Sequence, residues 1–231
     1  MREIVLDTET TGLDPDEGHR VVEIGAVELF NHLPTGRVFH EYINPERDMP
    51  AEAEKIHGIS AAFLEDKPVF SVIAEAFLAF LEMDGDGAAA PGTLVIHNAA
   101  FDMKFLNSEL VRLGYEAIGN ERVIDSLQLA RQRFPGAPAN LDALCRRFDV
   151  DASARTRHGA LLDSELLAEV YLGLIGGRQP DLDLAINKQG QKAKKAVERK
   201  ARAPRAHAPS RSELEAHQAF IETIKDPLWS R

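Results

Sequence analysis

Two carboxylic acids stand one residue apart near the start of the chain. Asp7 and Glu9 follow the apolar residues 4–6, and the pattern breaks at Gly12. Side chains two apart on a strand point to the same face, so these carboxylates are expected side by side at the end of a buried strand. Adjacent carboxylates repel each other unless a cation lies between them, and hard oxygen ligands favour Mg²⁺ or Mn²⁺. The alternative is that Asp7 caps a turn while Glu9 is solvated.

Two further acids and a histidine stand where other elements are expected to begin. Asp102 falls in the first turn of a helix that follows a buried strand at residues 93–97, and Asp163 lies early in a long amphipathic helix. The helix dipole alone is sufficient to explain an acid in the first turn of a helix, such as Asp102. The presence of the other acids at the ends of neighbouring elements indicates that they share a site. His158 precedes Asp163 by five residues, a spacing that does not align two side chains on a helix, so we place it in the preceding loop.

The elements that position these residues form an α/β pattern. Strands are expected at residues 4–9, 20–30 and 38–43, and their short connections predict an antiparallel meander. Glu23 interrupts the second strand, so it lies either on a solvated face or near the acidic site. Later strands at 93–97 and 123–125 alternate with helices, which predicts a mixed sheet covered by helices. Helices are expected at about residues 51–64 with Ser60 as a cap, 69–81, 98–113, 126–134 and 140–148. A last long helix is expected to open within residues 157–163, after His158, and to reach about residue 175.

Three segments resemble the motifs of a known family. Residues 7–12 (Asp-Thr-Glu-Thr-Thr-Gly), 97–102 (His-Asn-Ala-Ala-Phe-Asp) and 158–163 (His-Gly-Ala-Leu-Leu-Asp) resemble the three exonuclease motifs of the DEDD superfamily, in its histidine-bearing branch. Within it, the chain most resembles the epsilon proofreading subunits of bacterial DNA polymerase III, over about residues 2–177. The resemblance implies a ribonuclease H-like fold with a mixed five-stranded sheet flanked by helices. It also implies a 3′→5′ DNA exonuclease that removes misinserted nucleotides as nucleoside 5′-monophosphates.

The resemblance also implies roles for individual residues. Asp7, Glu9, Asp102 and Asp163 would hold two divalent cations, Mg²⁺ or Mn²⁺, about 4 Å apart, with Asp7 between them. His158 would take the proton of the attacking water, since an imidazole has an ordinary pKa of about 6.5. His57 could instead be a surface residue of a loop. The residues expected to contact the single-stranded 3′ end of primer DNA are Thr8, Glu9, Thr10, Gly12, Leu13, His57, Asn98, Phe101 and His158.

Charge divides the chain into two parts. Residues 1–184 carry a net charge of −16, whereas residues 185–231 carry +6. Nucleic-acid affinity comes mainly from Lys and Arg, so the acidic part should bind DNA poorly unless a partner delivers it. Cys145, the single cysteine, cannot form an internal disulfide and is expected to be a buried thiol. With no leader pattern and no apolar run of about 18 residues, the chain is expected to be cytoplasmic.

The tail carries two candidate docking segments. We expect a nuclease domain at residues 1–177, a flexible linker at 178–211 and a polymerase-binding segment at 212–231. Gln179, Leu182 and Leu184 form a Gln-x-x-Leu-x-Leu pattern that resembles peptides docking on the beta sliding clamp, and its position after the nuclease domain favours docking over the alternative of an ordinary linker. A short helix capped by Ser212 is expected next. The apolar residues of this helix and of the segment after it are expected to bind the DNA polymerase III alpha subunit. The alternative is that they pack on the nuclease domain. These residues are Phe220, Ile221, Leu228 and Trp229.

Two other functions remain open on the motifs alone. A stand-alone exonuclease of the same superfamily that trims RNA would share every acid, but it needs neither a clamp peptide nor a polymerase anchor. A non-catalytic replication adaptor is disfavoured because all four acids and His158 are intact. A small theta-like third subunit is a further possible partner.

Overall fold

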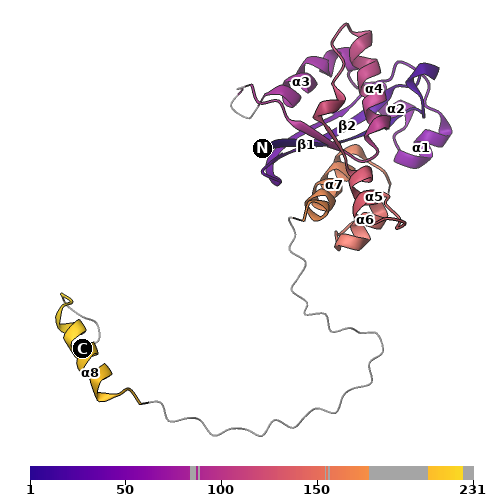
Figure 1. Cartoon of the computed structure of the whole chain (residues 1–231). Helices are drawn as coiled ribbons and strands as arrows, with labels where there is room; N and C mark the ends of the chain where they lie inside the picture. The colour runs from indigo at the N-terminus through magenta and orange to yellow at the C-terminus, as the bar shows by residue number, and fades with distance from the viewer. Residues whose placement is uncertain (84–86, 88, 154, 156, 177–207, 226–231) are drawn as a thin grey trace, which may run out of the picture. The chain divides into compact units, whose positions relative to one another are not determined.

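The computed structural model describes residues 1–83, 87, 89–153, 155, 157–176 and 208–225. The chain divides into two units, Met1–Leu182 and Asp183–Arg231, which are described separately. The first holds a five-stranded sheet with helices α1 to α7, and the second holds helix α8 (Figure 1). Within the described ranges, no helix is both long enough and apolar enough to cross a membrane.

The sheet has the order β3-β2-β1-β4-β5. β1 pairs with β2, and β2 with β3, in antiparallel fashion, whereas β4 is parallel to both β1 and β5. The mixed five-stranded sheet expected from the sequence is therefore confirmed. Its central strand β1 is covered on both faces, which explains its apolar run. The strands are β1 (Arg2–Thr10), β2 (Val21–Phe30), β3 (Leu33–Tyr42), β4 (Thr93–Ile96) and β5 (Val123–Asp125).

The third strand begins earlier than the sequence predicted. β3 starts at Leu33 rather than near Val38, because a two-residue turn at Asn31 and His32 joins it directly to β2. Both turn residues have positive φ, 50° and 68°, as the tight hairpin turns that match strand twist require. The buried Glu3 carboxylate accepts bonds from the His32 backbone N and Nδ1, at 3.2 and 3.0 Å. The hairpin is thereby tied to β1.

Helices cover both faces of the sheet (Figure 1). α3 and α4 pack on the face that carries Ile4 and Leu6, whereas α5, α6 and α7 pack on the face that carries Val5. The predicted helix at 51–64 is two helices separated at Gly58, which has φ 78°, and Ser60 caps the second as expected. Cys145 is buried on α6, also as expected. The helices are α1 (Ala51–His57), α2 (Ala61–Leu64), α3 (Phe70–Glu82), α4 (Ala99–Arg112), α5 (Ser126–Arg133), α6 (Leu141–Phe148) and α7 (Ala160–Leu174), with 3-10 turns at Pro15–Glu17 and Asn120–Arg122.

The first turn of α7 lies directly on β2. A Cβ at Gly25 would stand 2.2 Å from the backbone carbon of Ala160, so only glycine allows this approach. The Ser164 hydroxyl also donates to the Gly25 carbonyl oxygen, at 2.8 Å. A missing side chain on one strand therefore sets the position of the helix that carries Asp163.

In the second unit, the N-cap of α8 (Arg211–Glu222) lies two residues before the predicted cap. Ser210, not Ser212, is the N-cap, because Ser210 and Glu213 satisfy each other's backbone N–H groups in a capping box. Phe220 is 63% exposed, whereas Ile221 is only 8% exposed, so the expected apolar stripe is only partly accessible. The remaining tail residues of interest lie outside the described residues: Gln179, Leu182, Leu184, Leu228 and Trp229.

Candidate active site

Acids from three elements meet at the carboxyl end of β1. Asp7 and Glu9 follow Val5 in the alternation of the strand, so they point to the face covered by α7, which carries Asp163. Asp102 comes from the first turn of α4. An open cavity of about 400 Å³ is lined by all four acids and by His158, so the structure brings the five predicted catalytic residues together.

Thr8 fixes the position of Asp102. Its backbone N and its hydroxyl both donate to Asp102 Oδ1, at 3.1 and 2.7 Å. Both residues are buried. The strand therefore presents its own acids on one face and holds the acid of α4 from the other, with Thr8 acting as the link.

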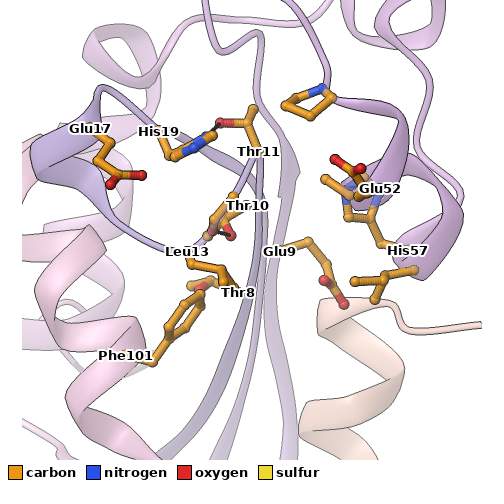
Figure 2. Close-up of a pocket in the computed structure, with 14 residues that line it drawn as sticks. Thr8, Glu9, Thr10, Thr11, Leu13, Glu17, His19, Glu52, His57 and Phe101 are labelled. Atoms are coloured by element: carbon orange, nitrogen blue, oxygen red, sulfur yellow. Dashed lines mark hydrogen bonds between the residues drawn. The ribbon is translucent and has the colours of Figure 1, made fainter.

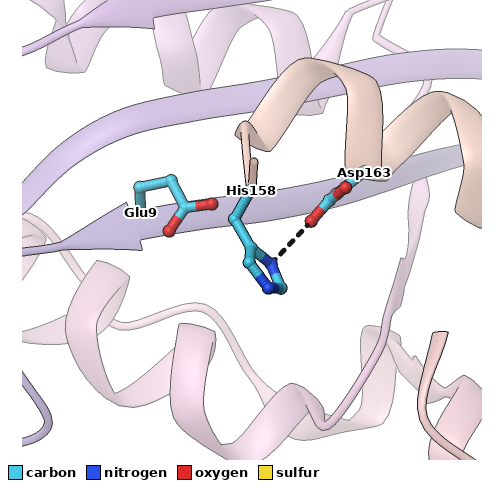
Figure 3. Close-up of side chains that lie close together, drawn as sticks. All are labelled: Glu9, His158 and Asp163. Atoms are coloured by element: carbon cyan, nitrogen blue, oxygen red, sulfur yellow. Dashed lines mark hydrogen bonds and ion pairs between the residues drawn. The ribbon is translucent and has the colours of Figure 1, made fainter. Parts of the chain in front are cut away.

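Figure 3 shows the His158 ring between Glu9 and Asp163. Ligand atoms of these three residues lie within 4.8 Å of one another. His158 Nδ1 is 3.2 Å from Asp163 Oδ2, and the His158 side chain is 50% exposed. The histidine precedes α7 (Ala160–Leu174), as its spacing from Asp163 predicted. It can therefore reach both the acids and solvent.

Arg155 is a site residue that the sequence reasoning missed. Its Nε and Nη2 donate to the two oxygens of Asp163, at 2.5 and 2.6 Å, and Nη1 pairs with Asp142. Nη2 also lies 2.8 Å from His158 Nδ1, and the Arg155 side chain is only 9% exposed. The sequence feature that could have indicated Arg155 is the group of basic residues Arg155, Arg157 and His158 in a domain with a net negative charge. The guanidinium takes the same oxygens that a divalent cation would use.

Burial and mutual repulsion raise the pKa values of Asp7, Glu9 and Asp102 and so favour their protonated forms. Burial, followed by the nearby Glu23 carboxylate, raises the pKa of Glu9 to about 8. Burial raises the pKa of Asp102 to about 7, although the bonds from Thr8 oppose this shift. Burial and then the Asp102 charge hold the pKa of Asp7 well above its ordinary value. Ionised oxygens confined this closely would be stabilised by divalent cations, so the donor set fits Mg²⁺ or Mn²⁺.

Glu23 lies beside the acids rather than on a solvated face. It is buried, pairs with Glu9 across the β1–β2 ladder, and contacts His40 Nε2 at 2.7 Å. Of the two alternatives for Glu23, the position near the acidic site is correct. It adds negative charge behind Glu9 without lining the cavity.

A second cavity of about 520 Å³ adjoins the acids (Figure 2). His57 forms part of its wall and is buried, so the surface alternative for this residue is wrong. Its Nδ1 accepts from the Ile59 backbone N at 3.0 Å, while its buried Nε2 has no hydrogen-bond partner among the described residues. His19 and Glu52 also line the cavity and were not foreseen. The predicted substrate-contact residues in this cavity are Thr8, Glu9, Thr10, Gly12, Leu13, His57 and Phe101, whereas Asn98 and His158 line the acidic cavity.

Comparison with solved structures places the fold among exonucleases. The nuclease domain of 3′hExo, a DEDDh family member bound to rAMP, matches with a TM-score of 0.64 and 19% identity, over 77% of this chain and 92% of that one. Exonuclease X in complex with 5′ overhanging duplex DNA matches with a TM-score of 0.56 and 23% identity, over 76% and 92%. Glu9, His158 and Asp163 of this chain supply ligand atoms that lie close enough together to hold a metal ion.

Sequence comparison narrows the assignment. The exonuclease family model RNase_T matches residues 4–171. DNA polymerase III subunit epsilon of Rickettsia prowazekii (strain Madrid E) is 52% identical over 231 residues, covering 97% of each chain. The subunit of the same name from Escherichia coli (strain K12) is 42% identical over 236 residues, covering 97% of this chain and 93% of that one. The chain therefore belongs to the exonuclease family and, within it, to the epsilon subunits of DNA polymerase III.

Proposed function

We propose that this protein removes misinserted nucleotides from the 3′ end of primer DNA while attached to a replicative polymerase. The observation that carries the proposal is the convergence of four acids and His158 beside a cavity large enough for one nucleotide. The relatives' name, a subunit of DNA polymerase III, supports DNA as the substrate and a polymerase as the partner. The products would be nucleoside 5′-monophosphates.

Asp7, Glu9, Asp102 and Asp163 would hold two divalent cations. When bound, such ions stabilise the charge on the attacking and leaving oxygens and lower the pKa of the attacking water. Thr8 keeps Asp102 aligned through its two bonds. Arg155 must share Asp163 with a cation, since it bonds to both oxygens of that carboxylate.

His158 is suited to accept the proton of the attacking water. Its contact with Asp163 is made through Nδ1. Arg155 Nη2 lies 2.8 Å from the same Nδ1 and can only donate, so Nε2 is the free base only when Nδ1 carries its proton toward Asp163 and Arg155 Nη2 donates to Asp163 Oδ2 instead. Half of the His158 side chain is exposed to solvent. Asp163 would therefore orient the imidazole as a general base.

The 3′-terminal nucleotide would occupy the second cavity. Leu13, largely exposed, and Phe101 offer apolar surface to a base, and His57 forms part of the same wall (Figure 2). A base and sugar placed there would bring the adjoining phosphate to the acids, because Thr8, Glu9 and Phe101 line both cavities. This arrangement favours cleavage at the strand end.

The tail would deliver the enzyme to the primer. We propose that residues 178–211 tether the nuclease domain at residues 1–177 to a polymerase-binding segment at 212–231, whose exposed Phe220 is one anchor. Tethering raises the effective concentration of an acidic domain at the primer end. Alanine at both Leu182 and Leu184 should abolish capture by a sliding clamp, and unchanged capture would rule out that contact.

Hydrolysis of a 5′-labelled, 3′-mispaired primer in Mg²⁺ or Mn²⁺ tests the activity. We expect loss of one nucleotide at a time from the 3′ end, faster on DNA than on the matching RNA, and abolished by Asp7→Ala. Faster trimming of RNA would favour the stand-alone ribonuclease. No cleavage of either strand would favour the non-catalytic adaptor.

A further inference from the structure

A third depression continues the groove beyond the acids. It has a volume of about 490 Å³ and is lined in part by His97, Asn98, Arg131 and Asn140. His97, Asn98 and Asn140 also line the acidic cavity, whereas none of the lining residues belongs to the cavity proposed for the terminal nucleotide. The acidic cavity thus lies between the other two, and together they form a continuous path.

Arg131 is the charged side chain in this third depression. It projects from α5 and is exposed, and it forms no ion pair with any carboxylate in the described ranges. The Asp125 carboxylate accepts through Oδ1 from the backbone N of Asn98 and of Leu127, at 3.2 and 2.9 Å, and it forms no ion pair with Arg131. The guanidinium is therefore available to a ligand, unlike that of Arg155, which Asp163 and Asp142 hold.

The order of the three cavities indicates which part of the DNA strand would lie beside Arg131. If the terminal nucleotide fills the first cavity and the scissile phosphate reaches the acids, the rest of the strand must leave through the third. A guanidinium with free N–H groups is suited to a phosphodiester, which it can bind with two parallel hydrogen bonds. The amides of Asn98 and Asn140 add neutral polar groups beside it.

We propose that Arg131 binds the phosphodiester one nucleotide upstream of the scissile bond. This inference rests on the proposed function and adds a subsite to it. The subsite contributes to substrate binding and not to the chemical step, so its loss should raise KM and leave kcat unchanged.

Short oligonucleotides test this assignment, because a trinucleotide contains the upstream phosphodiester and a 5′-hydroxyl dinucleotide lacks it. Arg131→Gln should raise KM for the trinucleotide about tenfold, the usual effect of losing one charge-assisted hydrogen bond, and leave the dinucleotide unaffected. The matched control is Arg146→Gln, which removes an exposed arginine of α6 outside the groove. This control substitution should leave KM unchanged for both the dinucleotide and the trinucleotide.

A trinucleotide with a neutral methylphosphonate at the upstream linkage completes the test. It should bind the wild type about as weakly as the natural trinucleotide binds Arg131→Gln, and the substitution should have no further effect on it. An equal loss on dinucleotide and trinucleotide, or a loss that persists on the methylphosphonate, would overturn the subsite. Absence of hydrolysis by the wild type would instead contradict the proposed function.

Discussion

Replacement of Arg155 by Gln should destabilise the protein mainly when divalent cations are absent. Arg155 and Asp163 form a buried pair through two hydrogen bonds. Removing one partner of a buried pair costs about 3–5 kcal/mol, and we expect the lower value because His158 Nδ1 still contacts Asp163 Oδ2. For a domain of this size, 3 kcal/mol corresponds to a fall in Tm of about 6–12 °C.

Divalent cations should remove most of this effect. A cation bound by Asp163 replaces the positive charge that Arg155 supplied. The other carboxylate paired with Arg155, that of Asp142, is 54% exposed, so water can solvate it after the arginine is removed. The loss should then fall to at most about 1 kcal/mol, as for exposed pairs. By linkage, the difference of about 2 kcal/mol means that Arg155→Gln binds the cation roughly 30-fold more tightly than the wild type.

Thermal unfolding in EDTA and in saturating Mn²⁺, together with calorimetric titration of Mn²⁺, measures both quantities. Arg157→Gln is the matched control, since it removes an exposed arginine from the same loop. Equal destabilisation of Arg155→Gln in the two conditions, or weaker binding of Mn²⁺, would refute competition between the guanidinium and the cation.

Three further outcomes are expected. In EDTA, the free energy of unfolding should fall as pH rises from about 5 to about 8, because Glu9 has a pKa of about 8 in the folded state against an ordinary 4.5 and so keeps its proton longer when folded. Urea titrations should give a slope of up to about 1.4 kcal/mol per pH unit. A stability that rises over this interval would contradict the raised pKa of Glu9. Gly25→Ala should lower both Tm and turnover by displacing α7 from β2, at a cost of at least about 1–3 kcal/mol, and normal turnover would show that this contact does not place Asp163. Thr8→Val should weaken Mn²⁺ binding about tenfold, because it removes the hydroxyl bond to Asp102 while the bond from the backbone N remains; an unchanged affinity in calorimetry would contradict this role of Thr8.

Local sequence patterns predicted the elements that carry the acids. The alternation around Asp7 and Glu9, and the apolar run before Asp102, are properties of a few adjacent residues, and the structure places each acid where that pattern indicated. The loop position of His158 followed from its spacing to Asp163. Periodicity was sufficient here because each side chain is oriented by its own element.

Features that depend on tertiary contacts were not predicted. The role of Arg155 comes from its approach to Asp163 across a loop, and the burial of His57 comes from its packing at the end of α1. Glu23 could not be assigned to a face until the register opposite Glu9 was known. The early start of β3 depended on two positive φ values at Asn31 and His32, which the apolar pattern does not contain.

The most direct test of the account separates metal binding from turnover in His158→Ala. Calorimetry with Mn²⁺ and single-turnover hydrolysis of a single-stranded DNA 3′ end should be measured on the same preparation, with Asp7→Ala for comparison. We expect His158→Ala to bind Mn²⁺ and DNA about as well as the wild type while losing roughly 10²–10⁴-fold in rate, as is typical when a general base is removed. Asp7→Ala should lose both metal binding and rate. An unchanged rate in His158→Ala would contradict the assignment of this histidine as the base.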